Sequence, residues 1–419
     1  MLDIKFIREN KDLVEQNNKN RGVKADVSKL LELDEQRRKL IAQADELRST
    51  RKKGSKGKPT EEEIKKMREV GDQITKTEAE LATVEAQYTE HLMKIPNLTH
   101  QESPIGGEDD FKVLFTNWDA EKFSFRPKDH EQLMLDHDMI DFERGAKVAT
   151  SKFYFAKNDL VRLNQALINY GIDVVTRHGY TLMETPDMAK NEILQGIGFN
   201  PRGEETQVYS IENTDMSLIG TAEITVGGYH ANETLDLSKG PIKYVALSHC
   251  FRTEAGAYGR TSKGLYRVHQ FAKLEMFVYC APEDSEKMHQ ELLAIEKEIA
   301  NGLEIPFRVI DIASGDLGGP AFRKYDLEAW MTMKGDDKVQ GDYGEITSTS
   351  NCTDYQARRL NIKHRKPDGT HEFVHTLNGT AVVLSRFPIA IMENHQQADG
   401  SIKIPKALQP YFGKDKIEK

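Results

Sequence analysis

Cysteine is scarce in this chain of 419 residues, which has only Cys250, Cys280 and Cys352. They are far apart in the sequence and odd in number, so they form neither a disulfide framework nor a CxxC metal site. Free buried thiols in a reducing compartment are the simplest interpretation, and we therefore expect a cytoplasmic protein. The histidines show no metal spacing such as HExxH, so the sequence gives no indication of zinc.

Long apolar runs and an excess of positive charge are also absent. No stretch of about 18 apolar residues occurs, so we expect no transmembrane helix. The first residues, MLDIKFIRENKDLV, have no apolar core of the kind that a secretory signal requires. The 58 Lys and Arg residues are outnumbered by 67 Asp and Glu, which gives a formal net charge of −9. This argues against a protein coated in positive charge for general nucleic-acid binding, although a local basic patch can still exist.

The first hundred residues are rich in charge and almost free of proline and aromatic residues. In the stretches 28–53 and 60–94, apolar residues recur at spacings of three and four. They are Leu30, Leu33, Leu40, Ala44 and Leu47, then Met67, Val70, Ile74, Leu81, Val84 and Tyr88. Such a narrow seam is typical of a coiled coil. Because the breaker-rich GSKGKP at 54–59 joins the two stretches, the sequence predicts an antiparallel helical hairpin.

Basic residues gather near the turn of this hairpin, with no acidic residue among them. They are Arg48, Arg51, Lys52, Lys53, Lys56 and Lys58. A run of charges is usually a solvated helix face. A run of one sign in an otherwise acidic chain also suits contact with a phosphate backbone, so both interpretations stay open at this point.

The chain changes character after this hairpin, which predicts the domain boundaries. Residues 101–110 contain proline, glycine and acids without an apolar period, and we interpret them as a linker. This places an N-terminal domain at 1–100, with its arm at about 28–94, and a second domain at 111–419. In the second domain, the pattern predicts a helix from about Asp159 to Arg177, followed by a strand at Tyr180–Thr185.

Two further segments predict an antiparallel strand pair, YVALSHCFRTE at 244–254 and LYRVHQFAKLEMFVYC at 265–280. The loop between them is too short for a crossover helix. Because side chains alternate along a strand, one face of the second strand is mostly apolar. The other face would carry Arg267, His269, Phe271, Lys273 and Glu275. A polar face is usually solvated, and the alternative is a ligand site.

The string FRTEAG…RVHQFAKLE resembles motif 2 of class II aminoacyl-tRNA synthetases, in the form typical of seryl-tRNA synthetases. MSLIGTAE (216–223) resembles the family's serine-binding loop, YGEITSTSNCTDYQARR (343–359) its metal-binding strand, and HTLNGTAVVLSRFPIAIMEN (375–394) motif 3. The resemblance covers essentially the whole chain. It implies an α+β fold, in which an antiparallel-sheet catalytic domain follows a coiled-coil arm that binds tRNA. It also implies that motif 1, which ends at Pro186, helps to build a homodimer.

The resemblance gives individual residues a role. Arg252 and Arg386 would be catalytic, because activation brings two anions together and needs positive charge between them. The serine-binding positions would be Thr221, Ala222, Glu223, Arg252, Glu275, Asn378 and Thr380. The ATP-binding positions would be Arg252, Thr253, Glu254, Val268, Phe271, Glu345, Ile346, Thr347, Ser348 and Arg386. The tRNA-binding positions would be Arg48, Arg51, Lys52, Lys53, Lys56, Arg260 and Lys263.

A magnesium ion is also implied, held by Glu345 and Ser348. Residues three apart do not share a face of a regular strand, so this interpretation requires a bulge or a turn near Thr347. The family usually has glycine before the motif 3 arginine, where this chain has Ser385.

The resemblance implies that the chain activates L-serine with ATP and loads it onto tRNA(Ser); whether tRNA(Sec) is also an acceptor stays open. Two alternatives remain. One is a related ligase that passes an amino acid to a carrier protein, although such relatives lack a complete tRNA arm. The other is a non-catalytic RNA-binding paralogue, although decayed paralogues lose the ATP arginines and the acidic ligands that are present here.

Overall fold

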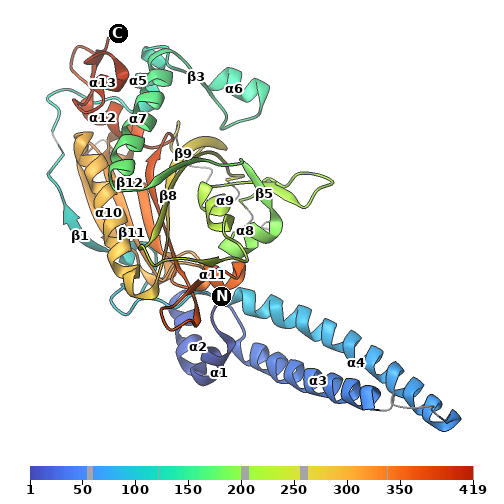
Figure 1. Ribbon diagram of the computed structural model, residues 1–419. Helices are drawn as coiled ribbons and strands as arrows, with labels where there is room; N and C mark the ends of the chain where they lie inside the picture. The colour runs from blue at the N-terminus through green and yellow to red at the C-terminus, as the bar shows by residue number, and fades with distance from the viewer. Residues whose placement is uncertain (54–59, 121, 200–206, 255–262, 337, 419) are drawn as a thin grey trace. The chain divides into compact units, whose positions relative to one another are not determined.

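The structure is a computed structural model that describes residues 1–53, 60–120, 122–199, 207–254, 263–336 and 338–418. It divides into two compact units, Met1–Leu98 and Thr99–Lys419, which are described separately (Figure 1). Residues 101–110 belong to the second unit, where the carbonyls of Pro104 and Gly106 accept hydrogen bonds from the N–H groups of Ser314 and Gly315. Within the described ranges, no helix combines the length and the apolar character needed to cross a bilayer.

The first unit is helical. Its helices are α1 (Ile4–Glu9), α2 (Lys11–Asn20), α3 (Val27–Lys53) and α4 (Glu61–Lys94). α3 and α4 pack side by side as the predicted hairpin (Figure 1), and at about 1.5 Å per residue α3 is roughly 40 Å long. The predicted apolar seam is buried or half-buried throughout, and Thr77 joins it. Thr60 caps α4 in a capping box with Glu63, which explains why the helix begins at this point.

The second unit is built on an eight-stranded sheet in the order β1-β10-β11-β12-β15-β9-β8-β4. Neighbouring strands are antiparallel except β4 and β8, which are parallel. The sheet therefore confirms the predicted fold class. The strands are β1 (Lys112–Thr116), β4 (Thr181–Glu184), β8 (Ile242–Phe251), β9 (Gln270–Cys280), β10 (Phe307–Asp311), β11 (Arg323–Met331), β12 (Asp342–Asn351) and β15 (His375–Val383).

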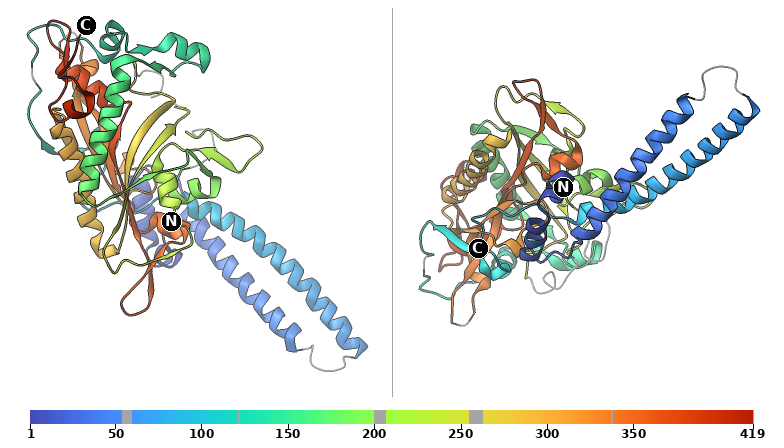
Figure 2. Two further views of the ribbon diagram at one scale, coloured as in Figure 1. Left: turned by 45° about the horizontal axis from the view of Figure 1, so that its top comes forward. Right: turned by 90° about the horizontal axis from the view of Figure 1, so that it is seen from below.

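Helices cover both faces of this sheet (Figure 2). One face packs against α7 (Asn158–Arg177), α10 (Ser285–Gly302) and α12 (Phe387–His395). The other packs against α8 (Asn191–Ile197), α9 (Ala222–Gly228) and α11 (Tyr355–Leu360). Leu274 and Met276 of β9 point into the first core, whereas Phe277 and Tyr279 point into the second. The preceding residues on the second face, Phe271 and Lys273, line a cavity.

Shorter elements complete the unit. The helices are α5 (His130–Asp136), α6 (Phe142–Val148) and α13 (Gln409–Phe412). The strands are β2 (Ile140–Asp141), β3 (Phe155–Ala156), β5 (Met188–Lys190), β6 (Met216–Leu218), β7 (Thr234–Leu235), β13 (Lys363–Arg365), β14 (His371–Phe373), β16 (Ile402–Lys403) and β17 (Lys416–Ile417).

The predicted helix from Asp159 to Arg177 is correct within one residue, but the predicted strand 265–280 is too long. β9 begins at Gln270 because the preceding chain turns: the Tyr266 N–H donates to the Lys263 carbonyl at 3.4 Å, and Gly264 has a φ of +59°. Arg267 and His269 therefore do not belong to the strand face that carries Phe271. Beyond the end of the paired strands, the Arg252 N–H still donates to the His269 carbonyl at 2.9 Å.

Candidate active site

A cavity of about 190 Å³ lies on the second face of the sheet, where motif 2, β12 and the end of β15 meet. Most of the predicted ATP-binding residues line it, although they come from segments far apart in the sequence. The lining consists of Arg252, Glu254, Tyr266, Arg267, Val268, Phe271, Lys273, Glu345, Ile346, Ser348, Thr380, Val383, Ser385 and Arg386. The structure thus brings the two predicted catalytic arginines to one place.

Arg252 follows β8 and is held without a carboxylate partner. Its Nε donates to the Gly220 carbonyl at 3.2 Å, and its guanidinium carbon lies 5.2 Å from the centre of the Phe271 ring. Within the part of the chain that the structure describes, Arg252 forms no ion pair, so its charge is available to an anion in the cavity. The ring supports the guanidinium through a cation–π contact.

Arg386 stands at the N-terminus of α12 and is oriented by backbone. Its Nε donates to the Tyr266 carbonyl at 2.9 Å and its Nη1 to the Glu345 carbonyl at 2.5 Å. The guanidinium carbon lies 3.8 Å from the centre of the Tyr266 ring. Tyr266 was not predicted as a site residue, since the sequence placed it inside a regular strand.

Glu254 has a φ of +48°, unusual for a residue other than glycine. Its Oε2 lies 3.5 Å from Nη1 of Arg267. Phe271 points to the cavity side as predicted and is 8% exposed. An aromatic ring and a carboxylate that line the same cavity suit a planar base that carries an exocyclic amino group.

Two buried carboxylates lie deeper on the same face. The Oε2 of Glu275 is 2.5 Å from Nζ of Lys273, and it accepts a hydrogen bond from Thr380 Oγ1 at 3.4 Å. The Oε1 of Glu223 accepts from Asn378 at 3.0 Å and from Gln356 at 2.8 Å. These contacts join α9, β9, α11 and β15, and the partner Gln356 was not among the predicted site residues.

The electrostatics of this pair favour an incoming cation. Burial and the nearby charge of Glu275 together raise the pKa of Glu223 to about 7, although the hydrogen bond from Gln356 opposes the shift. Burial also raises the pKa of Glu275, although Lys273 opposes the shift. A buried carboxylate that lacks full compensation is a suitable partner for an ammonium group. Thr221 caps α9 by accepting from the Glu223 N–H at 3.2 Å, and Ala222 is fully buried behind it.

The strand β12 has a bulge at the position that the metal interpretation requires. Leu327 of β11 pairs with Thr347, but the next residue, Glu328, pairs with Glu345, so Ile346 is the extra residue. As a result, Glu345 and Ser348 both line the cavity. The Thr347 side chain instead points away and donates to Glu296 at 3.0 Å.

Positive charge surrounds Glu345. Burial raises the pKa of its carboxyl group, but Arg386, Lys324 and Arg252 outweigh that effect and hold the pKa below its usual value. The carboxylate is therefore ionised at neutral pH. A carboxylate and a hydroxyl oxygen fit Mg²⁺, which prefers oxygen ligands and keeps several waters. The described residues contain no group of three His, Cys, Asp or Glu that could hold a metal alone.

Other predicted residues lie elsewhere. Thr253 donates its N–H to the Gln207 carbonyl and does not line the cavity. Lys263 pairs with Asp129 at 2.5 Å, and Arg48 pairs with Asp45 and with Glu78 of α4. Arg51 and Lys52 are exposed on α3, and Lys53 ends that helix. Lys56, Lys58 and Arg260 fall outside the residues that the structure describes.

Comparison with known proteins identifies the family. Residues 1–99 match the seryl-tRNA synthetase N-terminal domain, and residues 207–395 match the tRNA synthetase class II core domain (G, H, P, S and T). Across the full length of both chains, this chain is 54% identical to the serine–tRNA ligase of Treponema denticola. It is 49% identical to that of Rubrobacter xylanophilus, over 100% of this chain and 99% of the relative.

Solved structures agree. The seryl-tRNA synthetase of Pyrococcus horikoshii complexed with ATP superposes with a TM-score of 0.90 at 38% identity, over 100% of this chain and 99% of the other. The cytoplasmic serine–tRNA ligase of Naegleria fowleri in complex with AMP gives a TM-score of 0.86 at 33% identity, with the same coverage. The chain therefore belongs to the seryl-tRNA synthetase family of class II aminoacyl-tRNA synthetases.

Proposed function

We propose that the chain activates L-serine with ATP and transfers the seryl group to tRNA(Ser). One observation carries this proposal. Arg252 and Arg386, whose positive charges are not fully neutralised, line a cavity on one face of the sheet, and the buried carboxylates Glu223 and Glu275 lie on the same face. The cations suit the phosphates and the amino acid carboxylate. The carboxylates suit the ammonium and hydroxyl groups of serine.

In the activation step, a serine carboxylate oxygen forms a bond to the α-phosphorus of ATP. The bond from that phosphorus to the β-phosphate bridging oxygen breaks, and pyrophosphate leaves. Both reactants are negatively charged, so Arg252 lowers the barrier by lying between them with its planar fork toward both. Arg386 holds the distal phosphates in line, and Phe271 and Glu254 fix the adenine at the other end.

In the transfer step, the hydroxyl of the 3′-terminal ribose of tRNA attacks the seryl carbonyl carbon, and AMP leaves. The protein supplies no further nucleophile, because positioning carries most of this step. Serine is distinguished from alanine and glycine by its hydroxyl group, which Glu275 and Thr380 are placed to bind. An amino acid without that hydroxyl would form no hydrogen bond with either group in this buried site.

The proposal is tested by ATP–pyrophosphate exchange with serine, glycine, alanine and threonine, followed by tRNA charging. We expect exchange with serine to exceed the others by at least about 10²-fold, and tRNA(Ser) to be charged. Exchange with glycine or alanine but no charging of tRNA would favour a carrier-protein ligase. No exchange with any amino acid would favour an RNA-binding paralogue. Including tRNA(Sec) decides whether it is a second acceptor.

Serine binding is expected to depend on pH through Glu223. Its pKa of about 7 means that the free site holds a proton at lower pH, and this proton must leave before the ammonium group can pair with the carboxylate. The KM for serine should therefore rise about tenfold per pH unit below 7, whereas the KM for ATP should change little. Glu223→Gln should give a high serine KM that no longer varies with pH.

The heat stability of Glu223→Gln shows whether a high serine KM in this variant comes from the lost carboxylate or from unfolding. A carboxyl group whose pKa is raised in the fold, here from 4.5 to about 7, stabilises the fold below pH 4.5, and this contribution is lost as the pH rises through 7. Glu223→Gln should thus be at least as heat-stable as the wild type at pH 7.5. A pH-dependent serine KM in that variant would contradict the assignment.

Glu345 and Ser348 are proposed to hold Mg²⁺, with water and phosphate oxygens completing the coordination. When bound, the ion supplies positive charge that neutralises the phosphates. Glu345→Gln should raise the Mg²⁺ concentration needed for half-maximal exchange by about tenfold, because it removes the only charged protein ligand. Thr347→Ser is the matched control, since its side chain lies on the opposite face. An unchanged Mg²⁺ requirement in Glu345→Gln would exclude this site.

A homodimer is proposed, supported by apolar surface near motif 1. Val161, Leu182 and Met188 are each about two-fifths exposed or more. Met188 lines a hollow of about 620 Å³ and Val161 one of about 470 Å³, and the two hollows share Glu184 and Thr185 in their walls. Exposed apolar surface of this kind often marks an interface. Light scattering should give twice the mass of 47.6 kDa, and a mass of one chain at micromolar concentration would contradict the dimer.

The cytoplasm is the proposed location, because tRNA is charged there and thiols stay reduced. Cys250, Cys280 and Cys352 are all free and buried. Burial raises the pKa of the Cys250 thiol and raises that of Cys280 to about 12, so both stay protonated and unreactive. Cell fractionation tests this location, and recovery in a secreted fraction would exclude it.

A further inference from the structure

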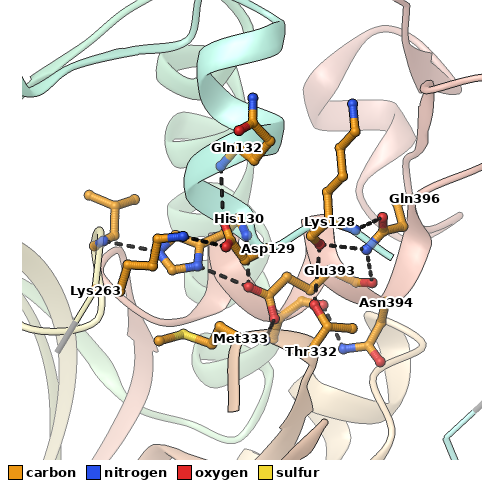
Figure 3. Close-up of polar contacts among 12 residues, drawn as sticks. Lys128, Asp129, His130, Gln132, Lys263, Thr332, Met333, Glu393, Asn394 and Gln396 are labelled. Carbon is orange, nitrogen blue, oxygen red and sulfur yellow. Dashed lines mark hydrogen bonds and ion pairs between the residues drawn. The ribbon is translucent and has the colours of Figure 1, made fainter. Parts of the chain in front are cut away.

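A buried histidine–glutamate pair lies outside the cavity, between the first turn of α5 and the last turn of α12 (Figure 3). His130 and Glu393 are both fully buried. Glu393 Oε1 accepts from the His130 N–H at 2.8 Å and from His130 Nδ1 at 2.9 Å. Its Oε2 accepts from the Met333 N–H at 3.0 Å, so both carboxylate oxygens are engaged.

The second ring nitrogen of His130 contacts the returning end of the motif 2 loop. The Leu265 N–H donates to Nε2 at 3.1 Å, so Nε2 is the accepting nitrogen and Nδ1 carries the hydrogen. Gly264 allows this approach: a Cβ atom there would lie 2.2 Å from Nε2. Lys263 also forms an ion pair with Asp129, the N-cap residue of α5, and this contact holds residues 263–265 against the same helix.

This segment leads directly into the cavity. The next residue, Tyr266, accepts a hydrogen bond from Arg386 through its carbonyl and packs its ring against the same guanidinium. Arg386 is the N-cap residue of α12, and Glu393 lies further along that helix. The loop is therefore tied to α12 twice: at Tyr266 through Arg386, and at Leu265 through His130 and Glu393.

We propose that His130 is a positioning residue for ATP. His130 is held by Glu393 and accepts the Leu265 N–H, which fixes the backbone at Leu265 and Tyr266. The Tyr266 carbonyl then accepts from Arg386 and orients its guanidinium group toward the nucleotide. Among the described residues, the side chain of His130 forms its hydrogen bonds with Glu393 and Leu265 and none with the serine-binding group, so we expect its effect to fall on ATP alone. This inference rests on the proposed function insofar as ATP is the ligand of Arg386.

Two substitutions at this position separate the loop contact from the buried packing. In His130→Gln, the amide can donate to Glu393 while its carbonyl reaches the Leu265 N–H. In His130→Asn, the shorter amide still donates to Glu393 but leaves the Leu265 N–H without its acceptor. Loss of one buried hydrogen bond should weaken ATP binding about tenfold in His130→Asn, and His130→Gln should stay within about threefold of the wild type.

ATP affinity is measured by calorimetry without amino acid, so the result does not depend on serine being the substrate. If the wild type shows no serine-dependent exchange, the proposed function is wrong, but the role of His130 in ATP binding is still tested by calorimetry. KM values for ATP and serine are compared in both variants. A rise in the ATP KM with an unchanged serine KM supports the positioning role.

Wild-type ATP affinity in His130→Asn would overturn the inference. Equal losses in His130→Asn and His130→Gln, or a parallel rise of both KM values, would also overturn it, because either result indicates a general packing role. If His130→Asn does not fold, Gly264→Ala acts from the loop side, since its Cβ displaces Nε2 while His130 and Glu393 remain. An ATP affinity of Gly264→Ala equal to that of the wild type would then overturn the proposal.

Discussion

Arg252→Ala should lower serine-dependent ATP–pyrophosphate exchange by about 10³-fold. Arg252 has no ion-pair partner within the described residues, so its charge does not stabilise the fold through an ion pair. Within the described residues, its guanidinium group contacts the Gly220 carbonyl and the Phe271 ring. Removing it leaves two anions to approach each other without a cation between them. The loss should appear mainly in kcat, because the charge matters most when the carboxylate meets the α-phosphate.

Arg252→Lys is the informative control for this prediction. It keeps the positive charge but loses the planar fork that can contact two anionic groups at once. We expect an intermediate loss of roughly 10²-fold, with thermal stability close to the wild type in both variants. Exchange at the wild-type rate in Arg252→Ala would remove the role given to this residue.

Alternation along a strand revealed part of the site in the sequence. Phe271, Lys273 and Glu275 were predicted on one face of β9. Phe271 and Lys273 line the cavity, and Glu275 accepts a hydrogen bond from Thr380, which lines it too. The bulge at Ile346 was required by the spacing of Glu345 and Ser348 and is present. These features are local, so a strand period of two is enough to predict them.

Contacts between distant segments were not predictable in this way. Glu223 meets Asn378 across 155 positions of the sequence, and His130 meets Glu393 across 263. A hydrogen bond of this kind depends on the packing of α9, α5 and α12, which no local pattern encodes. The error at 265–269 has a related cause: residues that look like a regular strand form a turn because His130 and Asp129 hold Leu265 and Lys263.

Shortening the helical hairpin should separate the two half-reactions. All residues that line the cavity belong to the second unit. Replacing residues 42–81 with a short Gly-Ser turn removes the outer hairpin, but it keeps the ion pair of Arg37 with Glu85 and the buried Leu30 and Leu33 at the base. Serine-dependent exchange should remain within about twofold of the wild type, while kcat/KM for tRNA(Ser) charging should fall by about 10²-fold or more.

A charge-reversal variant tests whether the loss arises from phosphate contacts. Arg48 is a poor choice, because Asp45 and Glu78 already neutralise it. Arg51→Glu combined with Lys52→Glu changes exposed side chains of α3 and leaves the apolar seam intact. If these residues contact the tRNA backbone, charging should fall and its dependence on salt concentration should become shallower, because fewer counterions are released.

The two variants together distinguish recognition by shape from recognition by charge. A loss in the truncation alone, with normal charging after charge reversal, would mean that the hairpin acts through its surface shape rather than through Arg51 and Lys52. Unchanged charging in both variants would refute the arm as a tRNA-binding element. Because exchange depends only on the cavity of the second unit, a parallel loss of exchange in either variant would indicate damage to the fold instead.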